Sequence, residues 1–228
     1  MKPERIAKFM AAAGLCSRRD AERWIEDGRV IVNGETLTTP ATLVSADDEI
    51  IVDGKRIKPK AEAPRLFVYH KPAGLVTSHR DEKGRATVFD HLPRDLPRVI
   101  SIGRLDLDSE GLLLLTTSGA LARAMELPAN AMARTYRVRI RGTPMETHYQ
   151  QLERGVRVDG VNYQPIDVVP DRSKEGRNQW LTLTLHEGKN REIRRIFELC
   201  FSFFWWRIFP EAGFGVWGLG FGVWGLGF

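Results

Sequence analysis

The sequence predicts an α+β fold with a small N-terminal domain and a larger domain built on a mainly antiparallel sheet. Strand-like apolar runs and helical patterns follow one another in mixed order, which is typical of α+β proteins rather than of regular βαβ repeats. Residues 55–64 are rich in Lys, Pro, Ala and Glu without apolar periodicity, which indicates a linker. We therefore expect one domain over residues 1–54 and a second from residue 65.

Two helices are expected first. Ile6, Phe9 and Met10 recur at helical spacing, and Gly14 can end that helix. Ser17 is a suitable N-cap for a second helix, with Asp20 three residues later, and Gly28 can terminate it. The second helix leaves three arginines for a solvated face: Arg18, Arg19 and Arg23.

The remaining elements follow from β-branched runs and helix-capping signals. Short strands over 29–33 and 49–53 complete the first domain. In the second domain strands are expected at 66–70, 99–103, 112–116, 135–140 and 180–185. Helices are expected from Ser118 to before Pro128, after a Thr143-Pro144 start with Glu146 as capping partner, and around Ile193, Ile196 and Phe197.

The composition favours an ordinary cytoplasmic protein with a polyanionic partner. The formal net charge is +5 and the sequence pI is about 9.4, although acids are almost as frequent as bases. Cys16 and Cys200 are too few for a disulfide framework and lack the spacing of a zinc site. The five histidines show no metal-ligand spacing either, and no segment is a convincing membrane span.

Residues 103–116 carry the most specific pattern. They read Gly-Arg-Leu-Asp, two residues, Ser, one residue, Gly, then an apolar run ending in Thr. Such a turn between two strands can hold a carboxylate at the lip of a cleft, although an ordinary surface loop has the same features. The segment resembles the signature of bacterial ribosomal-RNA pseudouridine synthases of the RsuA-like family.

The resemblance covers about residues 4 to 199. Further matching segments lie at 69–74, 85–93, 134–136 and 187–195. The first domain independently resembles the RNA-binding module that a small-subunit ribosomal protein shares with tyrosyl-tRNA synthetases. The pattern at residues 178–180 favours the branch that acts on large-subunit RNA.

The resemblance implies that Asp106 is the catalytic carboxylate and that no redox cofactor is needed. Asp106 would either attack the sugar or take a proton from it, and both routes need an ionised group that a nearby cation would stabilise. Asp108 occupies the variable position of the motif and is the natural control.

The target nucleotide must leave the RNA stack to reach such a carboxylate. Tyr136 is the candidate platform for the flipped base, and the alternative is a strand tyrosine that packs on the core. Arg104 could fill the space that the base leaves, or pair with a neighbouring acid.

The basic residues are candidates for phosphate contacts. Lys189, Arg191 and Arg194 lie at a strand end and at a helix start, where they either meet phosphates or steady Asp106. Lys71 is a further candidate, with a plain loop charge as its alternative. Clustering on one helix also favours phosphate contact for Arg18, Arg19 and Arg23.

The tail, residues 201–228, departs from the family. A seven-residue repeat, Gly-Phe-Gly-Val-Trp-Gly-Leu, occurs twice from residue 213, and the Arg-rich closing strand of the family is missing. We interpret the tail as a frameshift product that leaves the catalytic domain, residues 65–200, without a sheet strand and exposes Phe and Trp.

Three hypotheses about function remain at this point. The first is a monomeric isomerase that acts on ribosomal RNA, with large-subunit RNA favoured, or on a ribosome-assembly intermediate. The second is a non-catalytic RNA-binding or ribosome-assembly protein. The third is an inactive, misfolded product of a damaged gene.

Overall fold

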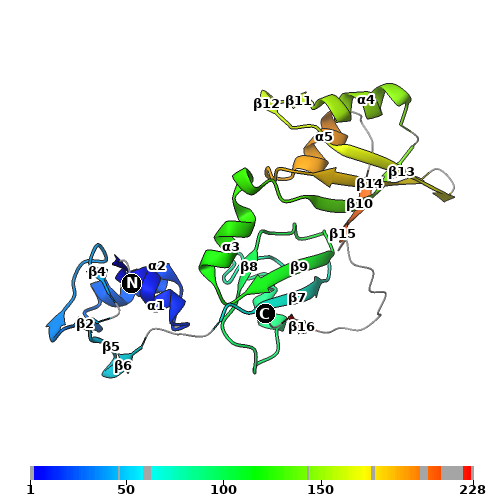
Figure 1. Cartoon of the computed structure of the whole chain (residues 1–228). Helices are drawn as coiled ribbons and strands as arrows, with labels where there is room; N and C mark the ends of the chain where they lie inside the picture. The colour runs from blue at the N-terminus through cyan, green and yellow to red at the C-terminus, as the bar shows by residue number, and fades with distance from the viewer. Residues whose placement is uncertain are drawn as a thin grey trace.

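The computed structural model describes residues 3–45, 47–58, 63–142, 144–175, 178–200, 205–211 and 223–226. Figure 1 shows three parts in succession: an N-terminal domain, a sheet in the middle of the molecule, which we call the central sheet, and a second sheet beyond it, the distal sheet. All pairings between the strands of these sheets are antiparallel, which confirms the predicted α+β class.

The N-terminal domain packs two helices on a four-stranded sheet of order β3-β2-β5-β6. Its elements are β1 (Glu4–Arg5), α1 (Ile6–Ala12), α2 (Arg18–Glu26), β2 (Val30–Val32), β3 (Glu35–Thr36), β4 (Leu43–Val44), β5 (Ile50–Val52) and β6 (Lys55–Ile57). The two helices were predicted correctly. The hydroxyl of Ser17 accepts from the Asp20 backbone N–H, and the Asp20 carboxylate accepts from Ser17 in return, as a capping box requires.

The start of the expected linker is folded. Residues Lys55–Ile57 form β6 and pair with β5, because Asp53 and Gly54 both adopt positive φ and close a two-residue hairpin turn. Residues 59–62 of the expected linker lie outside the described residues.

The central sheet has the order β16-β7-β9-β8. Its elements are β7 (Leu66–Lys71), β8 (Ile100–Ile102), β9 (Gly111–Thr116) and β16 (Val223–Leu226), with α3 (Gly119–Glu126) against β8 and β9. Apolar residues of β7 and β9 alternate toward a core that includes Phe67, Leu113 and Leu115. The Ser118 hydroxyl caps α3 through the Leu121 N–H, as predicted.

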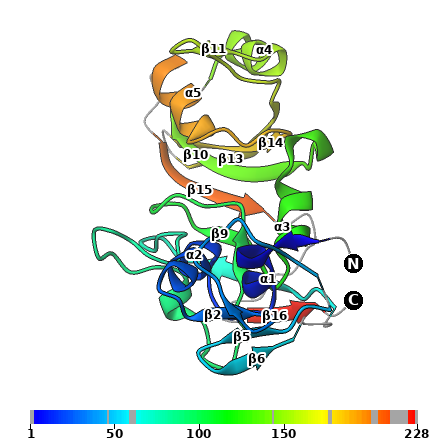
Figure 2. The ribbon, with the colours of Figure 1, turned by 90° about the vertical axis from the view of Figure 1, so that its left-hand side faces the viewer.

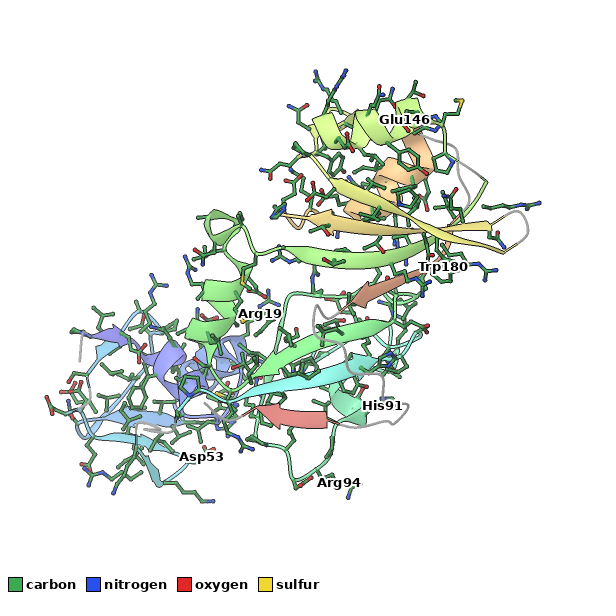
Figure 3. The ribbon with its side chains drawn as sticks, turned by 45° about the vertical axis from the view of Figure 1, so that its right-hand side comes forward. Arg19, Asp53, His91, Arg94, Glu146 and Trp180 are labelled. Carbon is green, nitrogen blue, oxygen red and sulfur yellow. The ribbon has the colours of Figure 1, made fainter. Side chains whose placement is uncertain are left out.

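The distal sheet has the order β13-β14-β10-β15. Its elements are β10 (Arg134–Arg141), α4 (Glu146–Arg154), β13 (Asp167–Glu175), β14 (Asn178–Leu185), α5 (Glu192–Cys200) and β15 (Trp205–Glu211), with a small hairpin of β11 (Arg157–Val158) and β12 (Val161–Asn162). Figure 3 shows Glu146 on the helical side and Trp180 on the opposite side of the sheet. The cores of the two sheets are therefore separate, with α4 and α5 burying the inner face of the distal sheet.

Two expectations for this part were wrong. Helix α4 begins after Met145, whose backbone N–H donates to His148, so Pro144 precedes the cap; Thr143 lies outside the described residues.

The tail was expected to leave the catalytic domain short of a strand, but β15 pairs with β10 and β16 pairs with β7. Strand β15 lies between β10 and β9 in both Figure 1 and Figure 2, where it brings the two sheets together.

Candidate active site

The loop that carries Asp106 connects β8 to β9 and begins at Gly103, which has a positive φ of 72°. A tight turn forms at Asp106, whose carbonyl accepts from the Ser109 N–H at 3.1 Å. Ser109 is buried, whereas the Asp106 side chain is 32% exposed. The carboxylate is thus within reach of a substrate while the backbone behind it is fixed.

Lys71 holds this loop from below. Its side chain is fully buried, and its ammonium donates to the carbonyl oxygens of Pro72 (3.0 Å), Asp106 (3.0 Å), Leu107 (3.3 Å) and Ser109 (2.8 Å). Burial lowers the pKa of Lys71 to about 8, against the nearby acids, which raise it. The prediction of an RNA contact for Lys71 was therefore wrong, because a buried ammonium committed to four carbonyls cannot also meet a phosphate.

Thr77 and Gly74 complete the support of the loop. The Thr77 hydroxyl donates to the Leu105 carbonyl at 2.9 Å and lies 3.3 Å from the Leu105 N–H, while the Gly74 N–H donates to the Leu107 carbonyl at 2.7 Å. Sequence reasoning missed Thr77, since a single threonine that follows a strand gives no signal of a contact with a distant loop.

Arg194 joins the two halves of the domain at Asp106. It lies on α5 of the distal half and is 2% exposed, yet its Nε is 2.9 Å from Asp106 Oδ2. Its other nitrogens reach Asp108 Oδ2 at 2.9 Å and the Ser109 hydroxyl at 3.1 Å. Of the two roles considered for Arg194, the structure supports the steadying of Asp106, because a buried guanidinium with these partners is not presented to RNA.

Asp108 is not an inert neighbour. Burial would raise its pKa, but the hydrogen bond and the charge of Arg194 outweigh this and hold the pKa of Asp108 below its usual range. Arg194 therefore pairs with both carboxylates, and a substitution of Asp108 will change the interaction between Arg194 and Asp106.

Arg191 and Lys189 lie on the turn before α5. Arg191 is exposed and its Nη1 is 3.9 Å from Asp106 Oδ2, so it adds a second, looser positive charge. Its φ of 52° is uncommon for a residue with a side chain and costs on the order of 1 kcal/mol or more. The Lys189 ammonium contacts Glu187 and lies 5.5 Å from the centre of the Tyr163 ring.

Tyr136 lies on β10 and is half-buried against the distal core. Burial raises the pKa of its hydroxyl, and the negative charges of Glu192 and Asp106 add to this rise against the opposing charge of Arg134. Tyr136 therefore lies near the candidate carboxylate and packs on the core, while its role as a platform for the flipped base stays a prediction.

The other candidate residues lie on the surface. Arg104 is exposed, and no acid among the described residues forms an ion pair with it. Arg18, Arg19 and Arg23 are exposed on α2, where Arg23 pairs with Asp20; Figure 3 labels Arg19.

A cavity of about 390 Å³ lies where α2 meets the catalytic domain. The first domain contributes Arg23, Trp24 and Arg29 to its wall, and Arg29 lies 4.6 Å over the Trp24 ring. The second domain contributes Arg80 and Arg98, and Arg80 lies 3.5 Å from Asp20 on α2. Both domains therefore form the wall, which carries four arginines and a tryptophan beside Asp20 and Asp27.

Neither a metal site nor a membrane span is found in the part of the chain that the structure describes. Its acidic, histidine and cysteine side chains form no group of three or more that could hold a metal ion. Its helices are too short or too polar to cross a bilayer. Cys16 is buried with a free thiol.

Known proteins resemble the chain along most of its length. Residues 65–199 match the RNA pseudouridylate synthase family, and residues 4–50 match the S4 domain. An uncharacterized RNA pseudouridine synthase of Rickettsia felis is 50% identical over 198 residues, which is 86% of this chain and 83% of that protein. The ribosomal large subunit pseudouridine synthase B of Bacillus subtilis is 38% identical over 196 residues, covering 86% of this chain and 80% of that protein.

A solved structure agrees on the fold. The crystal structure of a pseudouridylate synthase superposes with a TM-score of 0.61 at 24% identity, covering 91% of this chain and 87% of that one. These similarities favour the isomerase over the non-catalytic RNA-binding protein that the sequence left open. The chain thus belongs to the RNA pseudouridylate synthase family, whose members are isomerases, and carries an S4 domain in front of the catalytic domain.

Proposed function

We propose that Asp106 is the carboxylate with which this enzyme isomerises a uridine of ribosomal RNA to pseudouridine. The observation that carries the proposal is the 2.9 Å pairing of the part-exposed Asp106 carboxylate with the buried guanidinium of Arg194. The buried guanidinium fixes the carboxylate in place and sets a positive charge beside it. The backbone contacts of Lys71 and Thr77 keep the carboxylate in place.

The reaction balances without an oxidant or reductant. The bond from the sugar C1′ to the base N1 breaks, the base turns, a bond from C1′ to C5 forms, and the proton on C5 leaves as N1 gains one. Asp106 either attacks C1′ or removes a proton from the sugar, and both routes start from the carboxylate. Tyr136 would then stack on the flipped base, and Arg104, exposed at the loop, would fill the space that the base leaves in the RNA.

The proposed substrate is large-subunit ribosomal RNA or a ribosome-assembly intermediate, met in the cytoplasm by a monomer. The names of the Bacillus subtilis and Pseudomonas aeruginosa relatives, ribosomal large subunit pseudouridine synthase B, support this choice. The exposed arginines of α2 and the basic cavity beside them offer phosphate contacts away from Asp106.

Release of tritium from ribosomal RNA labelled at uridine C5 tests the proposal. Asp106→Asn should reduce release by on the order of 10³-fold, because it removes the ionised group while keeping the shape. Asp95→Asn, at an exposed acid of the same domain, is the matched control and should react like the unaltered chain. Equal release by Asp106→Asn would overturn the proposal, and RNA affinity measured beside it separates lost chemistry from lost binding.

A further inference from the structure

Two carboxyl side chains are buried together behind the site. Glu187 is 8% exposed and Glu192 is 4% exposed, and they flank the turn that carries Lys189 and Arg191. Lys189 contacts both of them: its ammonium meets Glu187, and its backbone N–H donates to Glu192 at 2.9 Å. The two carboxyl groups are close enough for each to shift the pKa of the other. Two buried carboxyl groups this close together are disfavoured in the doubly ionised form, so one of them holds a proton.

The surrounding groups indicate which one holds it. Glu187 accepts from the Gln164 N–H at 2.7 Å and from the Lys189 ammonium, and these partners keep its pKa below the usual range although burial opposes them. Glu192 accepts from the Lys189 N–H at 2.9 Å through Oε2. Its Oε1 is buried and meets no donor among the described residues, as expected of an oxygen that itself carries the proton.

The other charged or titratable groups that face Glu192 do not replace that proton. Lys189 lowers the pKa of Glu192, but burial and the Glu187 charge outweigh it and raise this pKa to about 7. Tyr136 lies on β10. Burial and the charge of Glu192 raise the pKa of its hydroxyl above the ordinary value of 10, so Tyr136 stays neutral near pH 7. Asp106 and Arg134 are the further charges around Tyr136.

We infer that protonated Glu192 is a positioning residue. It donates a hydrogen bond to Glu187 and thereby holds the turn that presents Arg191 and Arg194 to Asp106. The inference rests on the proposed role of Asp106. Arg191 needs such a hold because its φ is positive, and Arg194 lies one helical turn further along α5. When Glu192 ionises, repulsion from Glu187 opens the turn and loosens both arginines from the carboxylate.

The pH dependence follows from the direction of the shift. The pKa of Glu192 rises from its ordinary value of 4.5 to about 7 on folding, so the folded chain holds a proton that the unfolded chain has lost. The stabilising contact is complete below pH 4.5 and is lost as the pH rises through 7. If the ionised form is inactive, activity at pH 8 is about tenfold below its plateau.

The test is the pH profile of tritium release, each profile normalised to its own maximum. In Glu192→Gln, the carboxamide donates to Glu187 at every pH, so the fall centred near pH 7 should disappear. Glu187→Gln should remove it too, since the repelling charge is gone. Glu153→Gln, at an exposed acid of α4, should keep it. A second fall in activity, from loss of the Lys71 proton near pH 8, should remain in the unaltered chain and in all three variants.

A fall near pH 7 that persists in Glu192→Gln would overturn the inference. The pH dependence of the melting temperature tests the same proton without any catalysis. The unaltered chain should lose stability between pH 5 and 8 relative to Glu192→Gln, and parallel curves would also overturn the inference. If no variant releases tritium but the melting curves diverge, the proposed function fails while the shared proton stands.

Discussion

Replacing Lys71 by methionine tests how far the catalytic loop depends on one buried ammonium. Methionine keeps the length and the apolar stem but donates no hydrogen bond. Asp106 O and Leu107 O keep second donors, the Ser109 and Gly74 N–H groups. The carbonyls of Pro72 and Ser109 therefore lose the donor that Lys71 gives them and are left without a second one among the contacts described.

The size of the effect follows from these two acceptors. An unsatisfied buried acceptor costs roughly 1–3 kcal/mol, so two cost about 2–6 kcal/mol. Removing a buried ammonium also removes its desolvation cost, which places our expectation at about 2–3 kcal/mol. In a domain of this size such a loss lowers the melting temperature by roughly 4–12 °C.

Thermal unfolding followed by circular dichroism gives the melting temperature, and tritium release well below it gives the activity. We expect Lys71→Met to lose both stability and turnover, because the Asp106 backbone is no longer held. Lys83→Met, at an exposed lysine of the same domain, is the control and should match the unaltered chain. A Lys71→Met chain that melts within a degree of the control would refute this account of the loop.

Three further predictions concern the other contacts. Arg194→Lys should lower kcat by roughly 10–100-fold, because one ammonium cannot reach Asp106, Asp108 and Ser109 together. Steady-state kinetics measures this, with Arg154→Lys at an exposed arginine as the control, and an unchanged kcat would contradict the prediction. Combined Arg80→Gln and Arg98→Gln should flatten the salt dependence of RNA binding by about two in slope, seen in filter binding; an unchanged slope would exclude phosphate contacts in the cavity. Ending the chain after Cys200 should lower its melting temperature and favour aggregation, because β10 and β7 lose paired strands; an equally stable, monodisperse product in size-exclusion chromatography would show that β15 and β16 contribute nothing.

The origin of the tail is a separate matter from its folding. The match to the synthase family ends at residue 199, and the two later strands pair with β10 and β7. Backbone pairing needs an extended chain rather than a particular sequence, so a foreign segment can still cover a sheet edge. The frameshift hypothesis stays a prediction, and an alternative reading frame in the source DNA that encodes an Arg-rich strand would support it.

The sequence by itself determined the fold class and the position of the candidate carboxylate. Local signals sufficed for α2 and α3, because a capping serine and an apolar stripe act within a few residues. The long strand β13 was missed, since its Pro170 and its charged residues do not look like a strand. Six partner pairs with β14, on both sides of an irregularity between Pro170 and Lys174, nevertheless hold it in the sheet.

Only the tertiary structure decided what the basic residues do. Lys71 and Arg194 look in the sequence like any other cation near an RNA site, but folding buries both beneath Asp106. The shared proton of Glu187 and Glu192 was equally hidden, because the pKa of a carboxyl group depends on burial and on neighbours that the chain brings together only when it folds. Residue type fixes which charges are present, whereas packing fixes which of them meet the substrate and which hold the site together.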